Sequence, residues 1–185
     1  MSYFIIQQDP RVPGQPTVLD CPADMDPEDW ISGKLLAAPR NPLQLKMSAR
    51  SGKFRGAIIR GTLTLFHDRF RDELLKLGID NIQFFPVELE NPEGEIETKY
   101  SLINIVGMID AVDVANSVIE PREVGGRGWL KSFKIDAAAA RGQRIFRIPH
   151  APTLMIVDET LHASLTPLKL PGTWMLPTES YEGFN

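Results

Sequence analysis

The residues most often used for metal binding, acid–base catalysis or nucleophilic attack are, in this chain, three histidines and a single cysteine. His67, His150 and His162 stand far apart, and none of them forms an HExxH pattern or another metal-ligand spacing. Cys21 follows Asp20, whose negative charge disfavours the reactive thiolate. We therefore predict no metal site and no nucleophilic cysteine.

Phosphate-binding loops place glycines between a strand and a helix. The glycine-rich run "GGRG", residues 125–128, lacks that context and is predicted to be a hinge or a flexible loop. GxSxG and GxxxxGK[ST] patterns are absent as well. With no catalytic, cofactor-binding or metal-binding residue to name, the chain is predicted not to be an enzyme and to need no cofactor. An enzyme of unfamiliar type would require a deep polar pocket.

Acidic residues give the most promising binding surface. Glutamates recur along a predicted hairpin over residues 88–97, and alternate residues of a strand share one face. Two aspartates further on are three residues apart, a spacing that can share one helix face. Plainer roles stand beside this interpretation: a soluble hairpin that protects a sheet edge, and turn or helix caps. The predicted partner-binding residues are Glu88, Glu90, Glu93, Glu95, Glu97, Asp110 and Asp113.

Charge is distributed in blocks. Residues 1–39 hold six acids against two bases, whereas residues 40–60 hold six bases and no acid. A nucleic-acid-binding regulator that acts through residues 40–60 is therefore the alternative function. The net charge of −4 and the lack of interleaved aromatic residues count against it, and the blocks can also pair with one another. The six bases are Arg40, Lys46, Arg50, Lys53, Arg55 and Arg60.

The elements that would position these residues are short. Apolar side chains from Phe66 to Leu77 follow helical spacing, and Gly78 supplies the left-handed position after the helix. A strand, "NIQFFPVELE", is expected next, and its Pro86 favours a sheet edge or a bulge. "NPEG" at residues 91–94 then predicts a type I turn, and "KYSLINIVGMID" a central partner strand.

The remaining segments predict more strands and few helices. Strands are expected in "SYFIIQQ", "WLKSFKID", "QRIFRIP" and "GTWMLPT", and Asp158 is expected to cap a short helix. This mixed order indicates a single-domain α+β fold with a mainly antiparallel sheet. Residues 9–42 carry seven prolines and should be irregular, held down by Trp30 and Leu35. We expect residues 1–60 to form a proline-rich N-terminal extension packed on an α+β domain of residues 61–185.

Composition is that of an ordinary globular protein, with 43% hydrophobic and 24% charged residues in 185. A single cysteine excludes a disulfide within the chain. The start has no basic region of the kind that opens a signal peptide, and no run of about 18 apolar residues could span a membrane. We expect a cytoplasmic protein. Its oligomeric state cannot be read from these patterns.

Over roughly residues 60–180 the chain resembles the immunity-eleven family of bacterial polymorphic toxin systems. The resemblance rests on "FRDELLKLGIDNIQFFPVEL", on "YSLINIVGMIDAVDVANSV", on "IFRI" at residues 145–148, and on "LMIVDETLHASL" followed by "LPGTWML". His67 departs from the pattern, because such sequences tend to have a serine cap there. The resemblance implies an α+β fold and a cognate toxin as partner, often a nuclease or another effector. It also implies blockade of that toxin in the cytoplasm by shape and charge, without catalysis.

Overall fold

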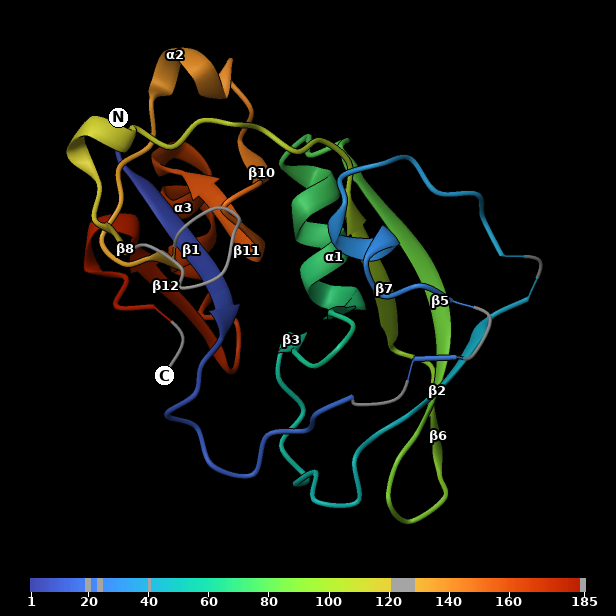
Figure 1. The fold of residues 1–185 in the computed structure, drawn as a ribbon. Helices are drawn as coiled ribbons and strands as arrows, with labels where there is room; N and C mark the ends of the chain where they lie inside the picture. Colours follow the sequence, from blue (N-terminus) through green and yellow to red (C-terminus); the bar gives the residue numbers. More distant parts are fainter. Residues whose placement is uncertain (19–20, 23–24, 40, 121–128, 184–185) are drawn as a thin grey trace.

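The computed structural model describes residues 1–18, 21–22, 25–39, 41–120 and 129–183 (Figure 1). One of its sheets is antiparallel throughout and has the order β10–β11–β1–β12. The strands of this first sheet are β1 (Tyr3–Gln8), β10 (Ile145–Ile148), β11 (Ala151–Asp158) and β12 (Thr173–Pro177).

The second sheet has the order β2–β5–β7–β4–β3, with β6 paired to β5. Only the pairing of β2 with β5 is parallel among its described strand pairs. A separate hairpin joins β8 (Ile119–Glu120) to β9 (Trp129–Leu130). The strands of the second sheet are β2 (Leu43–Lys46), β3 (Ile58–Ile59), β4 (Leu65–His67), β5 (Ile82–Glu90), β6 (Ile96–Glu97) and β7 (Tyr100–Ile105).

The helices are short, and within the described ranges none is long and apolar enough to cross a membrane. They are α1 (Asp68–Lys76), α2 (Ala137–Ala140) and α3 (Glu159–Leu165), with 3-10 turns η1 (Asp29–Ile31), η2 (Val114–Asn116), η3 (Thr166–Leu168) and η4 (Thr178–Ser180). The predicted α+β fold with a mainly antiparallel sheet and few short helices is confirmed.

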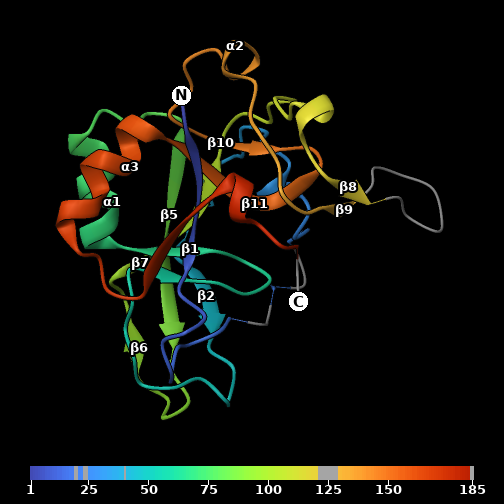
Figure 2. The same cartoon turned by 90° about the vertical axis from the view of Figure 1, so that its left-hand side faces the viewer.

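The two sheets share a core that both helices α1 and α3 enter. Figure 1 shows α1 between the sheet that contains β1 and the sheet that contains β5, and Figure 2 shows α1 beside α3. The shared cluster joins Phe70 of α1 and Leu161 of α3 to Ile6 of β1 and Ile103 of β7. Because successive residues of a strand face opposite ways, Ile5 leaves this cluster and enters a second one behind the first sheet.

Local sequence explains the ends of α1. The His67 ring accepts a hydrogen bond from the Arg69 backbone N–H at 3.1 Å, so this histidine caps the helix. Asp68 lies in the first turn, where the helix dipole favours negative charge. Gly78 has a φ of 75° and ends the helix as predicted. The start was predicted too early, because Phe66 belongs to β4, where pairing with Ser101 of β7 fixes it as a strand residue.

The edge position expected at Pro86 holds locally: up to Pro86 strand β5 pairs with β7 alone, and β2 joins its other side from Val87 onward, so β5 as a whole lies inside the sheet. Two further expectations need correction. Leu35 is 76% exposed and holds nothing down, whereas Trp30 is buried against the Phe85 ring. In "WLKSFKID" the strand is confined to β9, and the residues after it keep only irregular backbone contacts, such as those of Lys131 and Ser132 with Val118. The predicted loop over "EPREVGGRG" lies outside the described residues beyond Glu120.

Residues 1–60 supply strands to both sheets. β1 lies between β11 and β12 in the first sheet, while β2 and β3 flank the second. The division of the chain at residue 60 stays a prediction, and the two parts share every main sheet.

Candidate functional site

The acidic hairpin is built as its sequence predicts. The side-chain oxygen of Asn91 accepts hydrogen bonds from the backbone N–H groups of Glu93 at 3.0 Å and Glu95 at 2.9 Å. The Gly94 N–H donates to the Asn91 carbonyl at 2.9 Å, and Gly94 has a φ of 85°. Asn91 is buried, which fits a residue that fixes the turn from within.

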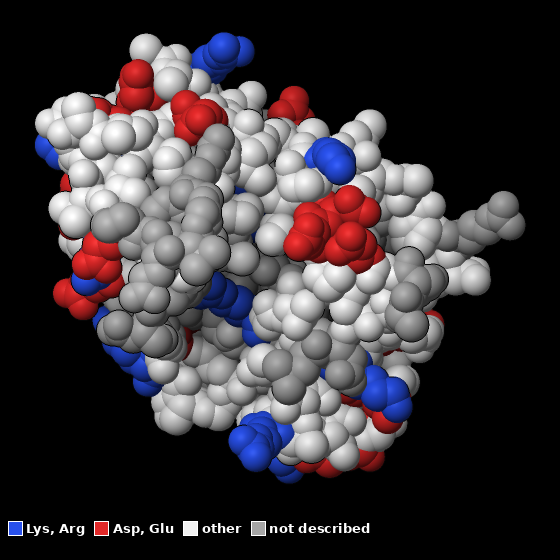
Figure 3. All heavy atoms as spheres, in the orientation of Figure 1, with Lys and Arg blue, Asp and Glu red and all other residues white. Residues whose placement is uncertain are grey.

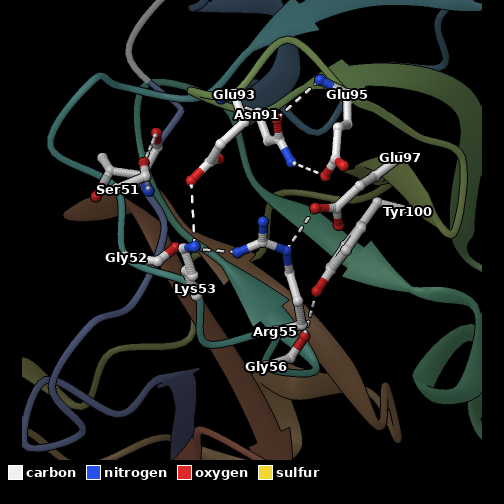
Figure 4. Close-up of polar contacts among 11 residues, drawn as sticks. Ser51, Gly52, Lys53, Arg55, Gly56, Asn91, Glu93, Glu95, Glu97 and Tyr100 are labelled. Atoms are coloured by element: carbon white, nitrogen blue, oxygen red, sulfur yellow. Dashed lines mark hydrogen bonds and ion pairs between the residues drawn. The ribbon is translucent and has the colours of Figure 1, made fainter.

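The glutamates of this hairpin are engaged inside the chain. Figure 4 shows the basic segment lying against the hairpin, with Lys53 directed at Glu93 and Arg55 at Glu97. The Arg55 Nε–Glu97 Oε1 distance is 2.6 Å. The remaining partners are Lys46 for Glu90 at 2.9 Å, Gln44 for Glu88 at 2.6 Å, and the Asn91 amide for Glu95 at 2.9 Å.

Arg55 holds the base of the hairpin in place. Its Nη1 donates to the Gly52 carbonyl at 3.0 Å, and the neighbouring Tyr100 hydroxyl donates to the Gly56 carbonyl at 2.8 Å. Burial, and then the Glu97 charge, raises the pKa of Tyr100 well above its usual range. The phenol therefore stays protonated and serves as a structural donor. This cluster joins residues 52–56 to residues 97–100, and its polar groups bind one another.

We expect the Arg55–Glu97 pair to contribute a coupling of about 1 kcal/mol, because both side chains are largely buried and their contact is short. The measurement is urea unfolding of Arg55→Ala, Glu97→Ala and the double variant in a double-mutant cycle. The coupling should fall as salt is added. A coupling below about 0.3 kcal/mol at low salt would mean that the pair is without energetic consequence.

Three of the six bases of residues 40–60 contact the acidic hairpin. Lys46, Lys53 and Arg55 each lie within ion-pair distance of a glutamate. Arg60 donates to the Gln7 side chain at 3.3 Å, and burial lowers its pKa. Arg40 lies outside the described residues. Few cations of this segment remain to meet a phosphate backbone, which weakens the nucleic-acid alternative.

Asp110 and Asp113 lie away from the hairpin. In Figures 1 and 2 the hairpin of β5 and β6 and the segment between β7 and β8 occupy opposite ends of the molecule. Asp113 caps η2, accepting from the Asn116 N–H at 3.2 Å and the Asn116 amide at 2.8 Å. Asp110 is exposed and lies 3.7 Å from His150 Nδ1. The seven predicted acids therefore do not form one continuous surface.

The histidines and the cysteine have structural roles. The described residues contain no group of three or more side chains able to hold a metal ion. His162 stacks on Phe4, with ring centroids 3.7 Å apart, and burial lowers its pKa. The Cys21 thiol lies 3.5 Å from the Met25 carbonyl oxygen.

The structure has a second acidic surface that was not predicted from the sequence. Asp26, Glu28 and Asp29 gather at η1, and Figure 3 shows a dense group of acidic side chains over this position. They form one wall of a groove of about 550 Å³, whose other lining includes Met108, Pro149 and Pro152. The excess of acids in residues 1–39 was the signal for this surface, but nothing in the sequence placed those acids beside Met108.

One buried cation is unusual. Arg147 of β10 is 1% exposed, and its Nη1 donates to the Pro152 carbonyl at 2.7 Å, while its Nε has no hydrogen-bond partner among the described residues. Burial, together with the nearby charge of Arg60, lowers the pKa of Arg147 to about 10. The guanidinium remains charged at neutral pH and supports the backbone beside the groove.

A comparison with protein families gives a match. The model of a family described as "Immunity protein family (Imm11)" matches residues 34–180. The match begins earlier than the resemblance noted from the motifs, so it takes in the basic segment as well as the hairpin. No curated protein matches the chain.

Proposed function

The chain belongs to the Imm11 immunity protein family, and from this premise we propose that it binds a cognate toxin domain and neutralises it by blockade. The family match carries the proposal, because it spans residues 34–180 and thus most of both sheets. The proposed place of action is the cytoplasm of a bacterium that makes the toxin, or of its kin.

Blockade without catalysis agrees with the chemistry of the side chains. The histidines cap, stack or pair, and the acids of the hairpin bind cations of the same chain. Exposed acids that lack a short ion pair gather at η1, where Asp26, Glu28 and Asp29 line the groove. Binding that is rapid and selective calls for such exposed charge, because complementary charge raises association rates and excludes wrong partners.

A nuclease is the toxin class that this charge distribution fits best. Nucleases bind phosphate backbones with basic surfaces, and an acidic inhibitor can occupy the same surface. Nucleic-acid binding by this chain itself is not proposed, since Lys46, Lys53 and Arg55 of the basic segment lie within ion-pair distance of hairpin glutamates.

Co-expression tests the proposed function directly. The toxin domain encoded beside this gene, expressed alone in a sensitive host, should arrest growth, and this chain expressed with it should restore growth. A catalytically inactive toxin domain should form a stable complex with the purified protein in gel filtration. A folded protein that neither binds that domain nor restores growth contradicts the proposal.

A further inference from the structure

We propose that the groove between η1 and Met108 is the surface that receives the toxin, and that it takes a segment bearing lysine or arginine next to apolar side chains. This inference rests on the proposed function and adds to it a location and the chemistry of the partner. It places recognition away from the acidic hairpin.

The groove has the size of a binding site. Its volume is about 550 Å³, and Met108 also lines an adjoining pocket of about 430 Å³ that extends past Asp110. Pockets of several hundred Å³ accommodate side chains or small ligands. Met108 therefore lines both hollows.

The walls supply two kinds of contact. Three carboxylates, those of Asp26, Glu28 and Asp29, face one lysine, Lys34, which leaves two negative charges in excess. Lys34 lies 3.9 Å from Asp29, and both side chains are at least half exposed, so this pair is loose. Apart from Ser32, the other lining is apolar and comes from Ile31, Met108 and two prolines.

The groove is held rigid by buried contacts behind it. Trp30 of η1 packs edge-on against Phe85, with ring centroids 5.0 Å apart. The Gly107 N–H donates to the Gly33 carbonyl at 2.8 Å, which joins the η1 wall to the Met108 segment. A Cβ at position 33 would lie 2.7 Å from the Met108 nitrogen, so only glycine permits this approach. Rigid walls reduce the entropy lost on binding.

Charge distinguishes this groove from the hairpin. Glu90 and Glu97 each form a short ion pair with a cation of the same chain, at 2.9 and 2.6 Å, and a partner would have to compete with that cation. The contact of Glu93 with Lys53, at 3.6 Å, is as exposed as that of Asp29 with Lys34. Glu28 has no such partner among the described residues, and Asp29 has only the loose contact with Lys34. A basic segment gains more by meeting unneutralised carboxylates, since complementary charge across an interface sets both encounter rate and partner choice. A strongly hydrophobic partner without cations would leave these acids unmatched.

The apolar floor decides which basic partner fits. A bare polycation would gain little from Met108 and the prolines, whereas the long aliphatic stems of lysine or arginine can lie along them. Leu35, 76% exposed, directly follows Lys34 and offers a further apolar contact beside the groove. We infer an occupant with one or two cations flanked by apolar residues.

The test compares two charge reversals of equal size. The groove variant is Glu28→Lys with Asp29→Lys, and the matched control in the hairpin is Glu93→Lys with Glu95→Lys. Both variants change the net charge equally, so only the position of the change differs. The probe is the catalytically inactive toxin domain encoded beside this gene, and association and dissociation rates are measured at low and at moderate salt.

We expect the groove variant to associate about tenfold more slowly at low salt and the hairpin variant to change less than about threefold. Circular dichroism must show both variants folded, and the neutral variant Glu28→Gln with Asp29→Asn should fall between the groove variant and the native protein. An unchanged groove variant, or a larger loss in the hairpin variant, overturns this assignment and leaves the proposed function intact. No binding by the native protein overturns both.

Discussion

Gly61→Ala is expected to destabilise the protein by about 2–3 kcal/mol, although it adds a single methyl group. A Cβ at position 61 would overlap the carbonyl oxygen of Val18 and lie 2.7 Å from the carbonyl carbon. Val18 is fully buried and forms a bridge with Met47, and its carbonyl accepts a hydrogen bond from the Thr62 N–H at 3.1 Å. The added Cβ would collide with backbone atoms of Val18, so no flexible side chain can move aside.

Urea unfolding of Gly61→Ala measures this cost, and Gly94→Ala is its control. Gly94 has open space around its Cβ position but a φ of 85°, so alanine there meets only backbone strain. That strain should cost about 1 kcal/mol. If Gly61→Ala proves no more harmful than Gly94→Ala, the crossing of residues 18 and 61 is looser than described.

Gly61 also illustrates what the sequence could not reveal. The glycines at 78 and 94 were predictable, because a helix end and a four-residue turn are local and carry recognisable patterns. The need for glycine at position 61 comes from a segment more than forty residues earlier in the chain. No local pattern reports such a contact, and the same holds for Gly33 beside Met108.

Strand pairing likewise has a local part that could be predicted and a long-range part that could not. The hairpin of β5 and β6 and the central place of β7 followed from a turn signal and from continuous burial. The error at Phe66 arose because apolar spacing continued from β4 into α1, and burial alone cannot separate a strand residue from a helix residue. The place of β1 between β11 and β12 depends on pairing across most of the chain, which a single sequence does not display.

At the candidate site, the sequence could not predict which charged segments contact one another. Blocks of acids and bases were evident, and so was the chance that they pair, but not which block pairs with which. In the structure the basic segment lies against the hairpin, and three of the five hairpin glutamates lie within ion-pair distance of its cations. Asp26, Glu28 and Asp29 gather at η1 instead, beside a groove whose two walls are joined where residues 33 and 107 meet. The family could be inferred from sequence motifs, whereas the groove beside η1 depends on contacts between segments far apart in the chain.

Phe70→Ala is expected to cost about 3–5 kcal/mol, because Phe70 is fully buried where the two sheets meet. Its ring lies 4.6 Å from that of Phe66, and its cluster includes residues of both main sheets, of α1 and of α3. The cavity left by the phenyl group would loosen both sheets together. Leu75→Ala is the control on the same helix: Leu75 is 52% exposed, and its loss should cost well under 1 kcal/mol.

Two tryptophans can test whether both sheets respond as one unit. Trp30 reports on the core beside the second sheet, where it packs against Phe85, and Trp174 lies in β12 of the first sheet. In each variant that retains only one of these tryptophans, the fluorescence midpoint should coincide with the midpoint from far-UV circular dichroism, and Phe70→Ala should lower both midpoints equally, by about 10 °C. Because β1 lies inside the first sheet while β2 and β3 pair within the second, residues 1–60 cannot unfold without breaking both. Separate transitions for the two probes would instead mean that the sheets are independent units and that α1 does not couple them.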